Sequence, residues 1–187
     1  DFTDYEQVEK EITDKTVALF IEPISNPQMI AIDVKPYYQL CKAKGLLSII
    51  DNTFLTPYLS TPLAEGADIV LHSATKYIGG HNDVLAGVVT VKDESLAQQL
   101  FDFHNMTGAT LSPIDSYLLL RGLKTLHLRI ERAQSNARKL AKKCQSLQAI
   151  DEVLYSGQTG MLSLRLNKAY SCLLYTSDAA DEEDSVD

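Results

Sequence analysis

The feature that most constrains the fold is a set of short, almost continuously apolar segments, several of which end at a polar residue. They cover residues 17–22 (VALFIE), 46–51 (LLSIID), 67–72 (ADIVLH) and 86–91 (AGVVTV). Segments of this length and composition predict strands that are buried on both faces, as in a parallel sheet. Helical signals separate the first strands, so the pattern predicts an α/β fold.

The segment between the first two strands contains both a break and a helix. Pro27 disfavours helical geometry at Asn26, so the chain should turn there. Asp33 can cap a helix that runs to Lys44, and Gly45 is its expected end because glycine tolerates left-handed backbone angles. This helix would connect two neighbouring parallel strands.

The second half of the chain changes character at Pro113. From there apolar residues recur alternately four and three residues apart as far as Leu147. The spacing could form a coiled-coil seam. The small Ala133 and Ala137 and the helix-weakening Gly122 favour instead a long helix packed on its own domain. Residues 161–166 (MLSLRL) then predict the first strand of a new sheet.

Charge and cysteine content exclude several classes of protein. The 17 basic and 25 acidic residues give a net charge of −8, and six of the acids lie in residues 178–187, so the body is close to neutral. Neither a nucleic-acid partner nor a membrane surface is expected, and no apolar run is long enough to span a bilayer. Three widely spaced cysteines fit reduced thiols in the cytoplasm, and no secretory signal precedes the first strand.

Polar residues with complementary chemistry follow two consecutive strands. Asp51 ends one strand, Ser73 lies at the end of the next, and Thr75 and Lys76 follow in a loop. Open α/β sheets bind ligands at the carboxyl ends of their strands. A lone aspartate or lysine at this position would not indicate a functional site. Pyridoxal phosphate, however, needs all three groups together: an amine, a carboxylate for its ring nitrogen and hydroxyls for its phosphate. The combination predicts a pyridoxal-phosphate site.

Several motifs carry a family resemblance. They are SNP at 25–27, DNTF at 51–54, GADIV at 66–70, HSATKY at 72–77, GGHxD at 79–83 and SYLLLRGLKTL at 116–126. Together they closely resemble the Cys/Met-metabolism family of pyridoxal-phosphate enzymes, which includes cystathionine γ-synthase, cystathionine β- and γ-lyases and methionine γ-lyase. The resemblance covers nearly everything before residue 170.

The resemblance implies a role for each site residue. Lys76 is expected to form the Schiff base with pyridoxal phosphate and to move the proton of the substrate's α-carbon. Asp51 would pair with the pyridinium nitrogen, and Ser73 and Thr75 would bind the phosphate. Asn26 resembles the asparagine that lies near the 3-oxygen of the cofactor and the substrate carboxylate.

The family also implies the fold and activity of the whole protein. Its members have the fold type I, aminotransferase-like α/β/α sandwich with a mostly parallel sheet. Two motifs, HNDVLAG at 81–87 and TGATLSP at 107–113, favour a cystathionine β-lyase type of carbon–sulfur lyase in transsulfuration. The alternatives are cystathionine γ-synthase, which adds a thiol to an activated homoserine ester, and an inactive fragment that only binds other subunits. We further expect a sulfur-containing amino-acid substrate, a homotetramer built as a dimer of dimers, and a cytoplasmic location.

The family is longer than this chain, which predicts how the chain is divided. Residues 1–125 would be the later part of the cofactor-binding large domain, and residues 126–170 the linking helix and the start of the C-terminal domain. Residues 171–187 have the composition of a non-native or disordered acidic tail. The isolated chain is expected to be inactive, because the family's ring-stacking aromatic and carboxylate-binding arginine lie in parts that this chain does not match.

A metal-dependent hydrolase is the alternative from another class. His72, His81 and Asp83 could be drawn as ligands beside Asp51. The two histidines are nine residues apart across a loop, however, and not at the i, i+4 spacing of a helical zinc motif. The sequence therefore predicts no metal site.

Overall fold

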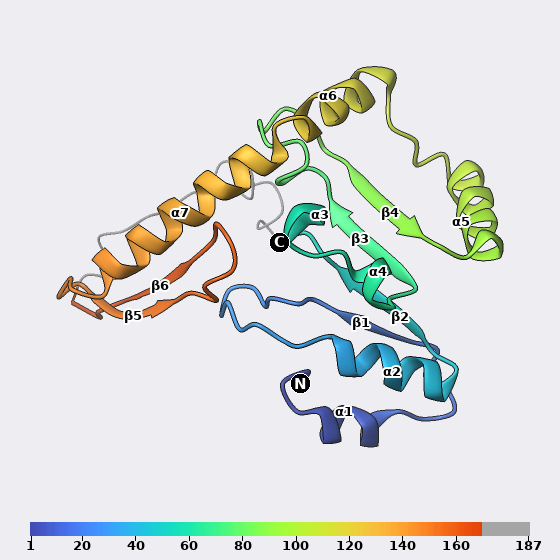
Figure 1. Cartoon of the computed structure of the whole chain (residues 1–187), viewed down its shortest axis with the longest axis horizontal. Helices are drawn as coiled ribbons and strands as arrows, with labels where there is room; N and C mark the ends of the chain where they lie inside the picture. The colour runs from blue at the N-terminus through green and yellow to red at the C-terminus, as the bar shows by residue number, and fades with distance from the viewer. Residues whose placement is uncertain (170–187) are drawn as a thin grey trace.

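The computed structural model describes residues 1–169 and contains one four-stranded sheet and one two-stranded sheet. The larger sheet has the order β1-β2-β3-β4, with β1 at Ala18–Ile21, β2 at Leu47–Asp51, β3 at Ile69–Ser73 and β4 at Gly87–Val91 (Figure 1). The strands β1, β2 and β3 are parallel. All four strands predicted from the apolar segments are confirmed to within two residues.

The fourth strand differs from its neighbours in direction. β4 is antiparallel to β3, and Ser73 pairs with Gly87. The thirteen residues 74–86 between them contain turns and no helix, whereas a parallel return needs a crossover. The sheet is therefore mostly parallel with one antiparallel edge strand, as the α/β prediction allows.

The main core lies between β1–β3 and the helix α2, Lys35–Lys44. Ile21, Ile50 and Cys41 are fully buried in it. Gly45 ends α2 in the left-handed conformation at φ 69°, as predicted. Asp33 does not provide the cap, because Val34 occupies that position. Within residues 1–169, Asp33 accepts a hydrogen bond from the Lys35 amide alone. On the other face of β1, Phe20 is 50% exposed.

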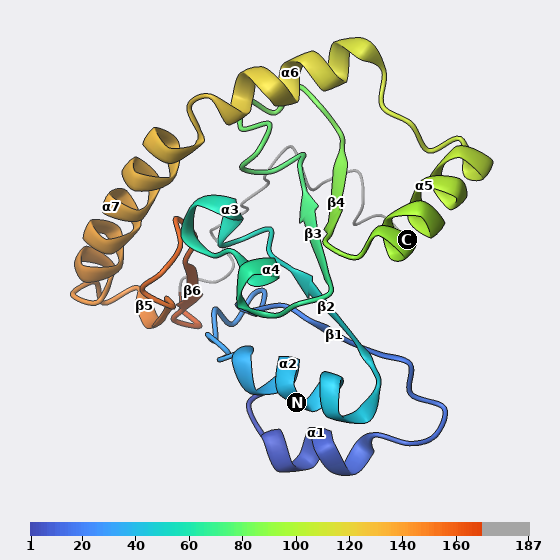
Figure 2. The ribbon, with the colours of Figure 1, turned by 45° about the vertical axis from the view of Figure 1, so that its right-hand side comes forward.

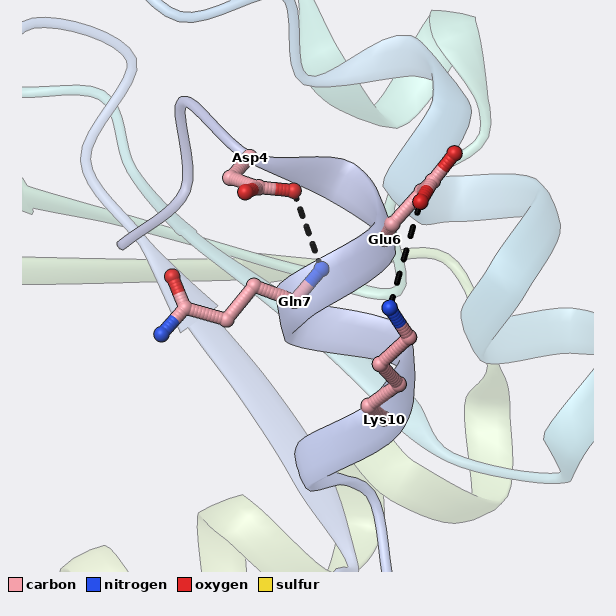
Figure 3. A network of polar contacts seen from close by, with 4 residues as sticks. All are labelled: Asp4, Glu6, Gln7 and Lys10. Carbon is pink, nitrogen blue, oxygen red and sulfur yellow. Dashed lines mark hydrogen bonds and ion pairs between the residues drawn. The ribbon is translucent and has the colours of Figure 1, made fainter.

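A short helix at the start of the chain covers α2. This helix, α1 at Tyr5–Glu11, was not predicted from the sequence. Asp4 caps it by accepting from the Gln7 amide at 3.0 Å, and an exposed Glu6–Lys10 pair at 3.9 Å follows one turn later (Figure 3). The Tyr37 hydroxyl of α2 donates to the Phe2 carbonyl at 2.8 Å, which joins the first residues to the core.

Three further helices surround the sheet. They are α3 at Thr56–Leu59, α4 at Pro62–Glu65 and α5 at Glu94–Thr107. Helix α5 was not predicted from the sequence. None of the residues of α5 is buried, so the apolar periodicity that reveals a packed helix is weak there.

The predicted long helix is two helices. Helix α6 spans Pro113–Leu123 and α7 spans Leu126–Cys144, and Figures 1 and 2 show the break between them. Leu119, Leu126 and Ile130 of the apolar seam are buried against the chain's own residues, which favours intradomain packing over a coiled coil. β5 at Ile150–Leu154 and β6 at Ser163–Leu166 form an antiparallel pair beneath α7.

Two further predictions concern membrane-spanning helices and the acidic tail. None of the helices in residues 1–169 combines the length and apolar content that crossing a membrane requires. The predicted acidic tail at 171–187 lies outside the described residues.

Candidate functional site

The carboxyl ends of β2 and β3 are joined through one threonine. Oδ1 of Asp51 accepts from the amide of Thr53 at 3.0 Å and from its hydroxyl at 2.5 Å. The same Thr53 hydroxyl accepts the amide of Ser73 at 2.7 Å. Thr53 therefore fixes the Asp51 carboxylate and the end of β3 relative to each other, and the structure brings Asp51 and Ser73 to one edge of the sheet.

The chain leaves β3 in a tight loop that carries Lys76. We call residues 74–80 the Lys76 loop. Its backbone is closed by hydrogen bonds from the Lys76 amide to the Ser73 carbonyl at 3.2 Å and from the Gly80 amide to the Lys76 carbonyl at 2.8 Å. The Lys76 side chain is exposed. The loop thus presents the lysine three residues beyond the end of β3.

Thr75 connects the Lys76 loop to β4. Its hydroxyl accepts the Ala86 amide at 2.9 Å and donates to the Ala86 carbonyl at 3.3 Å, while its own amide donates to that carbonyl at 3.1 Å. Thr75 therefore lies beside the predicted site but already has backbone partners. Its role in phosphate binding stays a prediction.

A small cluster of buried apolar side chains packs within and against the Lys76 loop. Ala74, Ile78 and Val84 form a small core with Leu119 of α6. Gly122 is also buried, and a Cβ added to it would overlap the carbonyl oxygens of Ile78 and Gly79. The backbone of α6 therefore lies directly against the backbone of the loop, which only a glycine at 122 permits.

His72 directly precedes Ser73 in β3, and its side chain is buried. It is 8% exposed, and its Nδ1 has no hydrogen-bond partner among the described residues. Burial lowers the pKa of His72, and this effect exceeds the opposite influence of the nearby Asp51 carboxylate. At neutral pH the ring is therefore uncharged.

Asn26 follows β1, whereas the other predicted residues lie at or after the ends of β2 and β3. It is exposed in the turn that follows β1, where Ile24 and Ala31 form an isolated bridge across the turn. β1 is parallel to β2, so this turn emerges at the same edge of the sheet as Asp51. No hydrogen bond within residues 1–169 joins Asn26 to the other four, and its assignment stays a prediction.

The structure does not group the residues of the alternative metal site into a ligand set within residues 1–169. Nδ1 of His81 lies 2.7 Å from the Gly79 carbonyl oxygen, so that nitrogen donates within the loop. Within residues 1–169, no three histidine, cysteine, aspartate or glutamate side chains are grouped closely enough to hold a metal ion.

The chemistry of the site fits pyridoxal phosphate. Within the described part of the chain, no hydrogen bond reaches Oδ2 of Asp51 or the hydroxyl of Ser73, so both are available to a ligand. Lys76 provides the amine on the adjacent loop. A carboxylate, a hydroxyl and an amine at the carboxyl ends of two parallel strands are the groups that this cofactor requires.

Sequence reasoning missed two residues that organise the site. Thr53 follows Asp51 by two residues, a spacing at which an aspartate often accepts local backbone hydrogen bonds, so a signal was present. Arg129 of α7 binds carbonyl groups of the Lys76 loop. Its contact depends on how α7 crosses the loop, and the sequence carried no signal for it.

Comparison with known proteins bears on this site. The family model of the Cys/Met metabolism PLP-dependent enzymes matches residues 1–171. A Bacillus subtilis protein described as cystathionine gamma-synthase/O-acetylhomoserine (thiol)-lyase is 51% identical over 168 residues, which are 90% of this chain and 45% of that protein. The Bacillus subtilis cystathionine beta-lyase MetC is 46% identical over 84% of this chain and 40% of its own length.

Solved structures agree with the sequence relatives. The cystathionine gamma-lyase of Lactobacillus plantarum, complexed with L-serine, superposes with a TM-score of 0.88 at 38% identity, over 90% of this chain and 49% of that one. A Corynebacterium glutamicum protein described as metB gives a TM-score of 0.86 at 36% identity. The chain thus spans about half the length of the relatives that it matches, and its α/β fold corresponds to part of theirs.

Proposed function

The chain belongs to the family of Cys/Met metabolism PLP-dependent enzymes, and on that premise we propose that it carries the cofactor lysine of an enzyme that breaks or forms a carbon–sulfur bond in an amino acid. The observation that carries the proposal is the Asp51–Thr53–Ser73 link, which places a carboxylate and a hydroxyl beside the Lys76 loop. The names of the two Bacillus subtilis relatives describe reactions on sulfur-containing amino acids or their precursors.

Each residue has one task in this proposal. Nζ of Lys76 would hold the aldehyde carbon of pyridoxal phosphate and, once released, take the proton from the substrate's α-carbon. Oδ2 of Asp51 would keep the ring nitrogen protonated, and the Ser73 hydroxyl, with Thr75, would donate to the phosphate. When bound, the cofactor supplies an electron sink for the charge that proton removal leaves on the substrate.

The neutral state of His72 supports the role of Asp51. A charged imidazolium behind the carboxylate would compete with the ring nitrogen for its negative charge. Because burial lowers the pKa of His72, the histidine offers no such competition at neutral pH. The Asp51 carboxylate would then be free to pair with the ring nitrogen of the cofactor.

Two reactions are candidates. The motifs at 81–87 and 107–113 favour a cystathionine β-lyase, in which the thiol leaves from the β-carbon. A cystathionine γ-synthase is the second candidate, because the Bacillus subtilis and Haemophilus influenzae proteins with gamma-synthase in their names are 51% and 48% identical to this chain. Lys76 and Asp51 would have the same roles in both reactions.

The test uses a hybrid protein, because the chain spans 45% of the Bacillus subtilis relative. In the hybrid, this chain's 168 matching residues replace the corresponding segment of that protein. With pyridoxal phosphate and cystathionine, release of pyruvate identifies a β-lyase. Formation of cystathionine from cysteine and an activated homoserine ester identifies a γ-synthase.

The cofactor assignment has its own readout. Borohydride reduction followed by peptide mapping should place the pyridoxyl group on Lys76, and Lys76→Ala should abolish both the label and turnover. Lys42→Ala is the matched control, since Lys42 is an exposed lysine on α2, and it should change neither. A label that stays in place in Lys76→Ala would refute the assignment.

We extend the proposal to assembly as a dimer of dimers. Large apolar side chains are exposed along α5 and α6, among them Phe103, Met106 and Tyr117, and Met106 is 81% exposed. Such a surface is typical of subunit contacts. Sedimentation of the hybrid should give a tetramer, whereas a monomer with full activity would contradict this extension.

A further inference from the structure

Arg129 of α7 reaches across to the Lys76 loop. Its Nη1 donates to the Tyr77 carbonyl at 2.6 Å, and its Nη2 lies 3.5 Å from the Ile78 carbonyl. Nη2 also donates to the Gly122 carbonyl at 2.8 Å, at the end of α6. One guanidinium therefore connects α7 and the end of α6 with the Lys76 loop, whose Tyr77 and Ile78 lie 52 and 51 residues before Arg129.

The contacts of Arg129 complete a run of fixed carbonyl groups. The carbonyl of Lys76 accepts from the Gly80 amide at 2.8 Å. The next two carbonyls, of Tyr77 and Ile78, have Arg129 as their donor. Three consecutive peptide groups, starting at the lysine, are therefore fixed, and two of them depend on a side chain from α7.

The charge of Arg129 is directed at these carbonyls. Within residues 1–169, no acidic side chain forms an ion pair with it, and burial lowers the pKa of its guanidinium. Its Nε also donates, to the Thr125 hydroxyl at 3.2 Å. A planar fork of donors can satisfy several acceptors at fixed angles, which a lysine ammonium cannot do.

The loop is shaped to receive the guanidinium. Gly80 has φ +74°, and a Cβ built on it would overlap the guanidinium of Arg129. The Tyr77 side chain extends toward a different segment, since its hydroxyl would lie 3.0 Å from a Cβ built on Gly160, between β5 and β6. Arg129 therefore holds the Lys76 loop against α7.

We propose that Arg129 is a positioning residue, which holds the backbone of the Lys76 loop from α7 and thereby fixes where the Lys76 amine can meet the cofactor. The inference rests on the proposed function of Lys76. It means that the helix following the cofactor-binding sheet takes part in orienting the lysine, although no residue of α7 was among those predicted for the site.

Two measurements on the 187-residue chain test the inference. Hydrogen exchange of the peptide covering residues 74–80 should be about tenfold faster or more in Arg129→Met, while exchange in β1 and β2 stays unchanged. After reaction with pyridoxal phosphate and borohydride, the ratio of label on Lys76 to label on Lys42 should fall by about tenfold or more. Arg129→Lys should give intermediate values in both.

The control is Arg132→Met, at an exposed arginine on the same helix, which should change neither readout. Unchanged exchange and an unchanged label ratio in Arg129→Met would overturn the inference. If Arg129→Met unfolds the chain, Arg129→Lys decides, and values equal to the unmodified chain would overturn it. Equal labelling of Lys76 and Lys42 in the unmodified chain would instead overturn the proposed function, while the exchange result would still decide the role of Arg129.

Discussion

Substituting Gly122 by alanine tests whether α6 supports the Lys76 loop as closely as the structure shows. Helix propensity alone predicts a gain, since alanine is better than glycine in a helix by about 1 kcal/mol. The added Cβ, however, would overlap the carbonyl oxygens of Ile78 and Gly79, which are backbone atoms and cannot rotate away. Overpacking of this kind costs about 3 kcal/mol at the upper end of its usual range. We therefore expect a net destabilisation of about 2 kcal/mol.

Urea unfolding of the chain, followed by circular dichroism, measures this change. With a slope of about 2 kcal/mol per molar urea, the midpoint should fall by about 1 M. Gly87→Ala is the matched control, because no atom lies within 4 Å of a Cβ built there and Gly87 has no positive φ. Its midpoint should not fall. A Gly122→Ala chain as stable as the unmodified one, or more stable, would show that α6 does not press on the loop.

Three further predictions concern the site itself. Thr53→Val should lower the free energy of unfolding by about 1–3 kcal/mol, because it leaves the Ser73 amide unpaired, and Thr53→Ser should restore it. Burial lowers the pKa of His72, so the unfolded chain binds a proton at this histidine more readily than the folded chain does. The urea midpoint of unfolding should therefore fall as the pH drops below about 6.5. His72→Gln should flatten this pH dependence. In the hybrid, Asp51→Asn should keep the borohydride label on Lys76 but lose at least about a hundredfold in turnover, and activity near that of the unmodified hybrid would leave Asp51 only a structural role.

The parts of the fold that could be predicted are those whose signals are local. The strands that end at Asp51 and Ser73 were visible because apolar runs there stop at polar residues, and Gly45 marked the end of α2. The helix α5 was missed because none of its residues is buried, so packing does not impose a pattern on its sequence. The division between α6 and α7 was also missed, since the apolar spacing continues across Lys124 and Thr125.

The residues of the candidate site also divide into those with a local signal in the sequence and those without one. Asp51, Ser73 and Lys76 follow strand ends, and the structure places them together because adjacent parallel strands end at one edge. The direction of β4 and the partners of Thr75 depend on how the chain returns after the loop, which no local pattern encodes. Arg129 contacts the loop from another element altogether, so only the three-dimensional arrangement reveals it.

The order of the strands in the larger sheet has a consequence for the speed of folding. Each strand pairs with the next one along the chain, from Ala18 with Leu47 to Ser73 with Gly87. Every pairing therefore closes a loop of about 30 residues or fewer, and such short closures are associated with rapid folding. We expect β1 to β4 to pair in the order in which a ribosome would release them, with the lysine-bearing loop formed as soon as β4 returns to β3.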